Sequence, residues 1–78
     1  MEDGTIVISL AGRDKGKKMA VVGGGDGFVL VADGKERRLY TPKRKNLKHV
    51  KATHERIDIM GLTDKALRRL FTSEEKNG

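Results

Sequence analysis

Short runs of apolar and β-branched residues, each ended by glycine, aspartate or proline, divide the first sixty residues into expected β-strands. In the run 5–10, Ile6 and Ile8 fall on one face of an extended segment, because side chains alternate along a strand. The run 28–32 is apolar on both faces, which predicts a central strand covered on both sides. The pattern predicts strands at 5–10, 19–22, 28–32, 35–40, 49–53 and 56–60.

Glycines, an aspartate and the single proline mark the connections between these runs. The segment 23–27 is glycine-rich and cannot pack a core, so it predicts a turn. The pair Asp33-Gly34 is typical of a two-residue hairpin that leads into the next strand. Pro42 has no backbone N–H for a sheet, and we therefore expect it to end that strand and to begin a basic loop over 41–47.

The hydrophobic period changes after Gly61 and predicts a short amphipathic helix. Thr63 is a suitable N-cap, and an apolar stripe follows at Ala66, Leu67, Leu70 and Phe71. The stripe either packs across an open end of the strand-rich part or contacts a partner protein. The residues after Thr72 are expected to fray.

Five or six short strands with tight turns favour a mainly β fold, and a small antiparallel barrel leaves few exposed edges. We therefore expect a barrel over residues 1–62 and a short C-terminal helix with a frayed tail over 63–78. A chain of 78 residues is one small domain with a thin core. It has no cysteine, an acidic start and no long apolar run, which predicts a cytoplasmic domain without disulfides, secretion signal or membrane span.

Positive charge is concentrated in two parts of a chain whose net charge is +6. The segment 35–56 has a net charge of +7 and the segment 13–18 a net charge of +3, whereas the rest of the chain is negative. Grouped cations indicate a polyanionic partner such as a nucleic acid, an anionic membrane or an acidic protein.

Sequence signals for catalysis, cofactors and metals are weak. Three residues separate Gly12 from Gly16, where a P-loop needs four, and no serine or threonine follows the lysine. His49 and His54 have no cysteine or close third ligand, so a metal site is not expected. No nucleophile is paired with a base, and we expect neither an enzyme nor a cofactor or small-molecule substrate.

The stretch "VISLAGRDKGKKMAVV" resembles a KOW motif, the glycine-centred strand–turn–strand unit of several ribosomal proteins and transcription elongation factors. The segments "VLVADGKERRL" and "PKRKNLKHV" extend the similarity over about residues 4–53 to large-subunit ribosomal KOW proteins of the archaeal and eukaryotic type and to short bacterial proteins like them. This resemblance implies an SH3-like barrel that binds ribosomal RNA, on or near the ribosome. The resemblance allows ribosomal proteins as further partners and does not imply a membrane.

The candidate RNA-binding residues combine the glycine turn with the basic segment that follows. Gly12 and Gly16 allow a tight turn whose backbone approaches a phosphate, with lysines and an arginine around it. Arg38 and Tyr40 fall on one face of the strand expected at 35–40, where the tyrosine either stacks on an unpaired base or packs in the barrel. The candidates are Arg13, Lys15, Gly16, Lys17, Lys18, Arg37, Arg38, Tyr40, Lys43, Arg44, Lys45, Lys48, His49 and Lys51.

Two other functions remain open from the sequence. The chain can be a protein-interaction module that docks a translation or transcription partner through its helix, with Leu67, Leu70 and Phe71 in contact. It can also bind DNA or an anionic membrane through charge alone. Because the chain has few aromatic residues, and Phe28 and Phe71 are expected in the core, a groove for proline-rich peptides is not expected.

Overall fold

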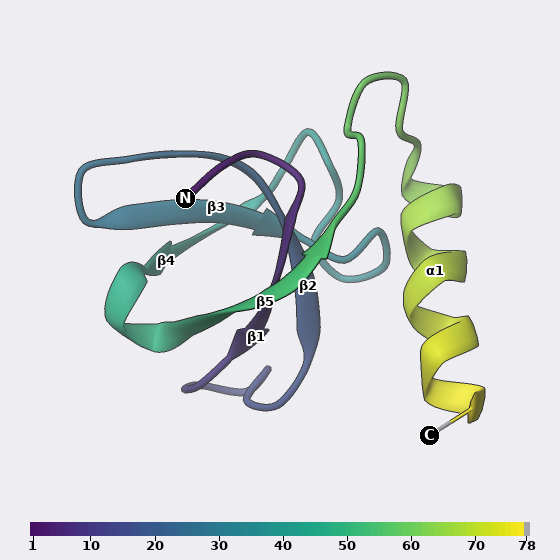
Figure 1. The fold of residues 1–78 in the computed structure, drawn as a ribbon, viewed down its shortest axis with the longest axis horizontal. Helices are drawn as coiled ribbons and strands as arrows, with labels where there is room; N and C mark the ends of the chain where they lie inside the picture. The colour runs from purple at the N-terminus through teal and green to yellow at the C-terminus, as the bar shows by residue number, and fades with distance from the viewer. Residues whose placement is uncertain (78) are drawn as a thin grey trace.

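The computed structural model describes residues 1–77, and the exposure of side chains over residues 1–72. Its strands form one antiparallel sheet in the order β4-β3-β2-β1-β5 (Figure 1). The elements are β1 (Thr5–Ser9), β2 (Lys18–Gly25), β3 (Phe28–Ala32), β4 (Lys43–Asn46), the 3-10 helix η1 (Leu47–His49), β5 (Val50–Arg56) and the helix α1 (Asp64–Asn77). The mainly β fold with a C-terminal helix is therefore confirmed.

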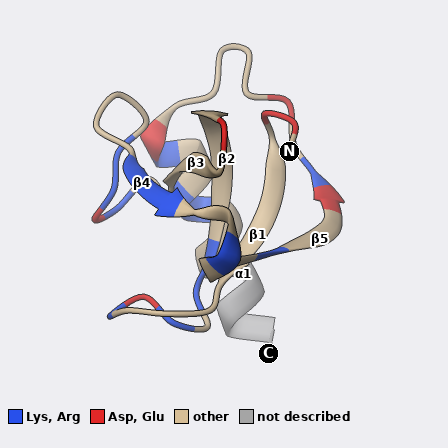
Figure 2. Ribbon diagram, turned by 90° about the vertical axis from the view of Figure 1, so that its left-hand side faces the viewer, with Lys and Arg blue, Asp and Glu red and all other residues tan. Residues whose placement is uncertain are grey.

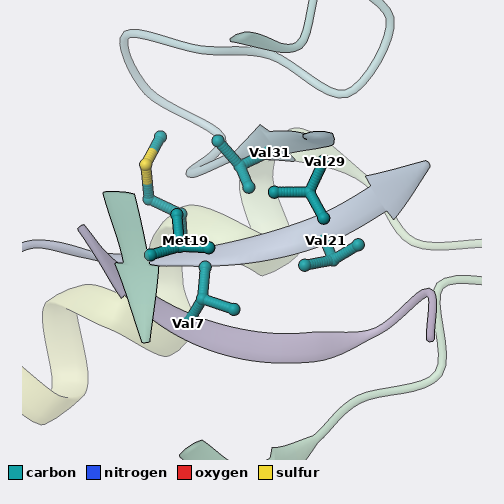
Figure 3. Packing of buried hydrophobic residues seen from close by; sticks show 6 residues of the cluster. Val7, Met19, Val21, Val29 and Val31 are labelled. Carbon is teal, nitrogen blue, oxygen red and sulfur yellow. The ribbon is translucent and has the colours of Figure 1, made fainter. Parts of the chain in front are cut away.

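The sheet curls around an apolar interior, and η1 joins its two edge strands, β4 and β5 (Figure 1). Shifts of register bend β1 between Thr5 and Val7, and β2 between Val21 and Gly23. The interior is filled by branched side chains and one methionine (Figure 3). These residues are Val7, Met19, Val21, Val29, Val31 and Val50.

The outer face of the three central strands is covered by α1. Ile6, Ala20 and Ala32 are cross-strand neighbours in one row, and all three are buried. Leu67 and Phe71 of the helix belong to the same buried cluster. The two alanines are small, which lets the helix approach the sheet closely. The apolar stripe of the helix therefore packs against the sheet.

β3 lies inside the sheet between β4 and β2, but on its outer face only Ala32 is buried, while Phe28 and Leu30 are half-buried. The expected cover on both sides is therefore present at the end of the strand only.

The start of α1 is fixed by side-chain and backbone contacts. Thr63 Oγ1 accepts a hydrogen bond from the Ala66 amide at 3.1 Å, which confirms the expected N-cap. Gly34 has a φ of +81°, and a Cβ at this position would lie 2.8 Å from the Arg68 backbone nitrogen. Only glycine allows the helix to rest so closely on this loop.

The strand expected at 35–40 is wrong, because these residues form an irregular loop. The carboxylate of Asp33 accepts hydrogen bonds from the Lys35 and Arg37 amides, at 2.9 and 3.0 Å, and closes a local turn instead of a hairpin. The loop expected at 41–47 is also wrong, since β4 lies within it and Pro42 directly precedes that strand.

Other boundaries differ from the prediction by smaller amounts. β2 continues through Gly25, so the glycine-rich segment is largely strand and not turn. The strand expected at 49–53 is β5, which follows η1 and continues to Arg56. The strand expected at 56–60 is wrong, because residues 57–60 form no strand. The helix continues to Asn77, where fraying was expected, and Gly78 lies outside the described residues.

Candidate nucleic-acid interface

The turn between β1 and β2, residues 10–17, is a tight loop that exposes its cations. Gly16 has a φ of +86°, and its amide donates to the Ser9 carbonyl at 2.7 Å. No atom lies within 4 Å of a Cβ built at Gly16, so the glycine is required by the backbone conformation and its outer side faces open space. Arg13, Lys15 and Lys17 are all exposed. The turn presents three cations on a backbone with a defined shape.

Asp14, the one acidic residue of this turn, is directed inward and holds it in place. Its Oδ1 accepts a hydrogen bond from the Ser9 hydroxyl at 2.8 Å and lies 2.9 Å from Lys45 Nζ. Its Oδ2 lies 3.4 Å from Lys43 Nζ. Burial raises the pKa of this carboxyl, but hydrogen bonds from Lys45 and Ser9 and the two lysine charges outweigh it and lower the pKa to about 2. Asp14 is therefore charged at neutral pH, within a basic turn.

Lys45 is a structural residue, which corrects its assignment as an RNA contact. Its side chain is 6% exposed, and its ammonium donates to Ser9 Oγ at 2.7 Å and to the Ala11 carbonyl at 2.8 Å, besides the pair with Asp14. Lys45 pairs with Val29 across the strands and so points into the barrel. We therefore remove Lys45 from the interface. Sequence reasoning missed Ser9 and Asp14, and the only signal was an aspartate between four cations.

Three other segments of the chain meet the β1–β2 turn. Lys17 Nζ lies 3.9 Å from a Glu36 carboxylate oxygen in the loop 33–42, and Lys43 of β4 contacts Asp14. The Leu10 amide donates to the His49 carbonyl at 2.8 Å, which joins η1 to the turn. Figure 2 shows the loop 33–42, β4 and the β1–β2 turn along the same, left-hand side of the barrel. We call these segments, residues 10–17, 33–42 and 43–49, the basic flank.

The loop 33–42 supplies the basic flank with exposed cations and one exposed aromatic side chain. Arg37 and Arg38 are exposed, and Tyr40 is 79% exposed. Tyr40 therefore does not pack in the barrel. The expectation that Arg38 and Tyr40 share the face of a strand is wrong, because this segment is not a strand. The carboxylate of Asp64 accepts a hydrogen bond from the Leu39 amide at 2.7 Å and ties the loop to α1.

The remaining candidates have separate environments. Arg44 is exposed, and its guanidinium carbon lies 4.0 Å from the centre of the Phe28 ring, which is half-buried and not in the core cluster. Lys18 is half-buried and lies 3.2 Å from Glu55. Lys48 and His49 are exposed on η1, whereas Lys51 is exposed on β5, outside the basic flank.

A hollow of about 330 Å³ lies where the turn, the loop 33–42 and α1 meet. Lys17 and Lys18 approach it from the turn and β2, Lys35 from the loop, and Arg68 from the helix. Lys35 and Arg68 are not among the sequence candidates. Lys35 belongs to the basic segment, and Arg68 to the polar side of the helix, but no pattern in the sequence indicates that the two converge. The other lining residues are Gly16, Asp33, Glu36, Phe71 and Thr72.

No group of three or more histidine, cysteine or acidic side chains suitable for a metal ion is found among the described residues. Within that same part of the chain, no helix is both long and apolar enough to cross a membrane. No protein-family model and no curated protein sequence matches the chain. The resemblance to KOW proteins therefore stays a prediction.

Proposed function

We propose that the chain binds structured RNA through the phosphate backbone, with the basic flank as its interface and without catalysis. The observation that carries the proposal is the meeting of three basic segments at the β1–β2 turn, through Lys17–Glu36, Lys43–Asp14 and the Leu10–His49 backbone bond. Cations grouped on one side bind a polyanion far better than cations spread evenly, because several phosphates are neutralised at once.

RNA suits a rigid cationic turn better than duplex DNA does. The major groove of an RNA helix is too narrow for side chains to read, so proteins recognise RNA duplexes through shape, phosphates and 2′-hydroxyls. The basic flank exposes point charges on a fixed backbone, and one tyrosine that is free to stack on an unpaired base. The similarity to ribosomal KOW proteins favours ribosomal RNA as the target and the cytoplasm as the place of action.

Salt dependence of binding tests this proposal directly. We would measure the Kd for a fluorescein-labelled RNA hairpin by anisotropy at several salt concentrations. If five to seven phosphates are neutralised, log K falls against log salt with a slope of roughly −4 to −6. Affinity that does not change with salt would contradict the proposal. A DNA hairpin of the same sequence, used as competitor at matched salt, separates RNA binding from binding through charge alone.

A pair of charge-matched variants localises the interface. Replacing Arg13, Lys15 and Lys17 together by glutamine removes three exposed cations of the turn and should make the slope less steep by about 3. The control replaces three exposed cations outside the basic flank, Arg56, Lys65 and Arg69. Equal weakening by the two triple variants would show that the charge acts without a defined site. In cells, crosslinking and sequencing of the attached RNA would identify the target.

The structure favours this function over docking of a partner through the helix stripe. Leu67 is fully buried and Phe71 is 9% exposed, so neither side chain is available to a partner while the helix is packed. Truncating them would test the fold and not an interface.

A further inference from the structure

We propose that the hollow between the β1–β2 turn, the loop 33–42 and α1 seats a phosphate group of the bound RNA, which makes the helix part of the RNA interface. This inference rests on the proposed function and extends it to the helix, which the sequence does not assign to RNA binding. Four cationic side chains converge on the hollow, and they come from β2, the turn, the loop and the helix. The fold thus brings together cations from segments that are far apart in the sequence, which the basic composition alone does not indicate.

The charges around the hollow favour an anion. Four cations outnumber the two carboxylates that line it. Asp33 accepts hydrogen bonds from the Lys35 and Arg37 amides, and Glu36 lies 3.9 Å from Lys17. No ion pair joins Lys35 or Arg68 to an acidic side chain within residues 1–72. Within these residues, two exposed cations therefore remain that can bind an external anion, one from the loop and one from the helix.

The dimensions and lining of the hollow fit a phosphate of a nucleic-acid chain. Its volume of about 330 Å³ is at the lower end of the range for ligand sites and is large enough for a phosphate with part of its sugar. Arginine offers several N–H donors in a plane that matches phosphate oxygens, and lysine adds a point charge. Thr72 is exposed and lines the same hollow, and a threonine hydroxyl can donate one more hydrogen bond.

The position of α1 relative to the loop is well defined, which a phosphate site requires. The helix rests on Gly34, and the Asp64 carboxylate holds the Leu39 amide. Leu67 and Phe71 anchor the same helix turns in the core. Arg68 is therefore held at a fixed distance from the loop that carries Lys35, and the phosphate would bridge the two.

The test compares two double variants that remove the same charge. Lys35→Gln with Arg68→Gln changes the hollow, whereas Lys65→Gln with Arg69→Gln changes exposed cations of the same helix that do not line it. We would measure the Kd of each for the labelled RNA hairpin across salt, after unfolding curves have shown that both variants keep the wild-type fold. Losing one phosphate contact should raise the Kd about eightfold at 0.1 M salt and make the slope less steep by about 0.9, and the control should change by less than about twofold.

Three outcomes would overturn the assignment. If the wild type shows no salt-dependent RNA binding, the proposed function fails and the hollow fails with it. If the wild type binds and the two double variants weaken binding equally, only the assignment of the hollow fails. In a separate NMR titration with inorganic phosphate, shifts of the Gly16, Lys17 and Arg68 amide resonances report the binding of a free anion. Saturation by phosphate, combined with normal RNA affinity of the hollow variant, would identify a small-anion site instead.

Discussion

Replacing Asp14 by asparagine should destabilise the fold strongly, although the residue lies in a surface turn. The substitution keeps the size of the side chain and removes the charge that Lys45 faces at 2.9 Å. Breaking a buried ion pair by removing one partner typically costs about 3–5 kcal/mol, because the other charge stays in the interior without compensation. A domain of 78 residues has a total stability of about 4–12 kcal/mol. Asp14→Asn should therefore remove a large part of it.

The magnitude can also be worked from the titration of Asp14. Its pKa falls from 3.8 to about 2 in the folded chain, which corresponds to about 2 kcal/mol of extra stabilisation of the charged form. This figure takes the protonated acid as its reference. Because Lys45 can keep its hydrogen bonds to Ser9 and Ala11 in Asp14→Asn, the loss can also fall below the full cost of a broken pair. We therefore expect a loss of about 2–5 kcal/mol for Asp14→Asn.

Urea unfolding followed by far-ultraviolet circular dichroism would measure this loss. Lys45→Met in the Asp14→Asn background removes the unpaired ammonium and should restore part of the stability. Exchange of the Gly16 and Lys17 amides, which donate to the carbonyls of Ser9 and Asp14 in the turn, should quicken in Asp14→Asn. An Asp14→Asn protein within about 0.5 kcal/mol of the wild type, or a double variant less stable than Asp14→Asn alone, would refute the reasoning.

Two further predictions concern acid stability and the docking of the helix. Because the pKa of Asp14 is lower in the folded chain than in the unfolded one, the unfolded chain binds the proton first as the pH falls. The stability due to this group is therefore present above about pH 4 and is lost towards about pH 2, and the difference in unfolding free energy between wild type and Asp14→Asn should narrow over that range in urea unfolding. A difference that stays constant would contradict the assignment. Gly34→Ala should lower the free energy of unfolding by well over 2 kcal/mol. The control, Gly27→Ala, should lower it by only about 1–2 kcal/mol, because Gly27 has a φ of +78° but open space around it. Similar losses of stability in thermal unfolding would show that α1 does not need the close approach at Gly34.

The regular elements with a strong hydrophobic pattern could be predicted from the sequence. β1 carries β-branched side chains that are buried on both faces, β3 carries Val29 and Val31 towards the interior, and the helix has a cap at Thr63 and an apolar stripe. β4 could not be predicted, because its sequence Lys-Arg-Lys-Asn has no apolar residue and it is a strand only through its pairing with β3. The Asp33-Gly34 pair was misleading, since the same two residues suit a hairpin and a side-chain-closed turn, and the packing of the helix decides between them.

For the candidate interface, the sequence predicts which segments are basic, but not which of their side chains lie on the surface. The grouping of cations in the turn and the basic segment is visible in the sequence, but burial is not. Lys45 and Arg44 are neighbours in one strand, yet one points into the barrel and the other covers the Phe28 ring. The buried Lys45 pairs with Asp14, which lies 31 residues earlier in the chain. The two residues become adjacent only when β4 joins the sheet.

The cover that α1 provides for Ile6, Ala20 and Ala32 has a consequence for synthesis of the chain. These strands are made first, but their outer face lacks its two buried neighbours from the helix, Leu67 and Phe71, until these residues have left the ribosomal exit tunnel. β1 likewise waits for β5, its partner on one side, before its edge is closed. A nascent chain halted before residue 64 would therefore expose the outer face of the sheet that α1 covers. Chaperone capture or aggregation during translation would begin from this intermediate.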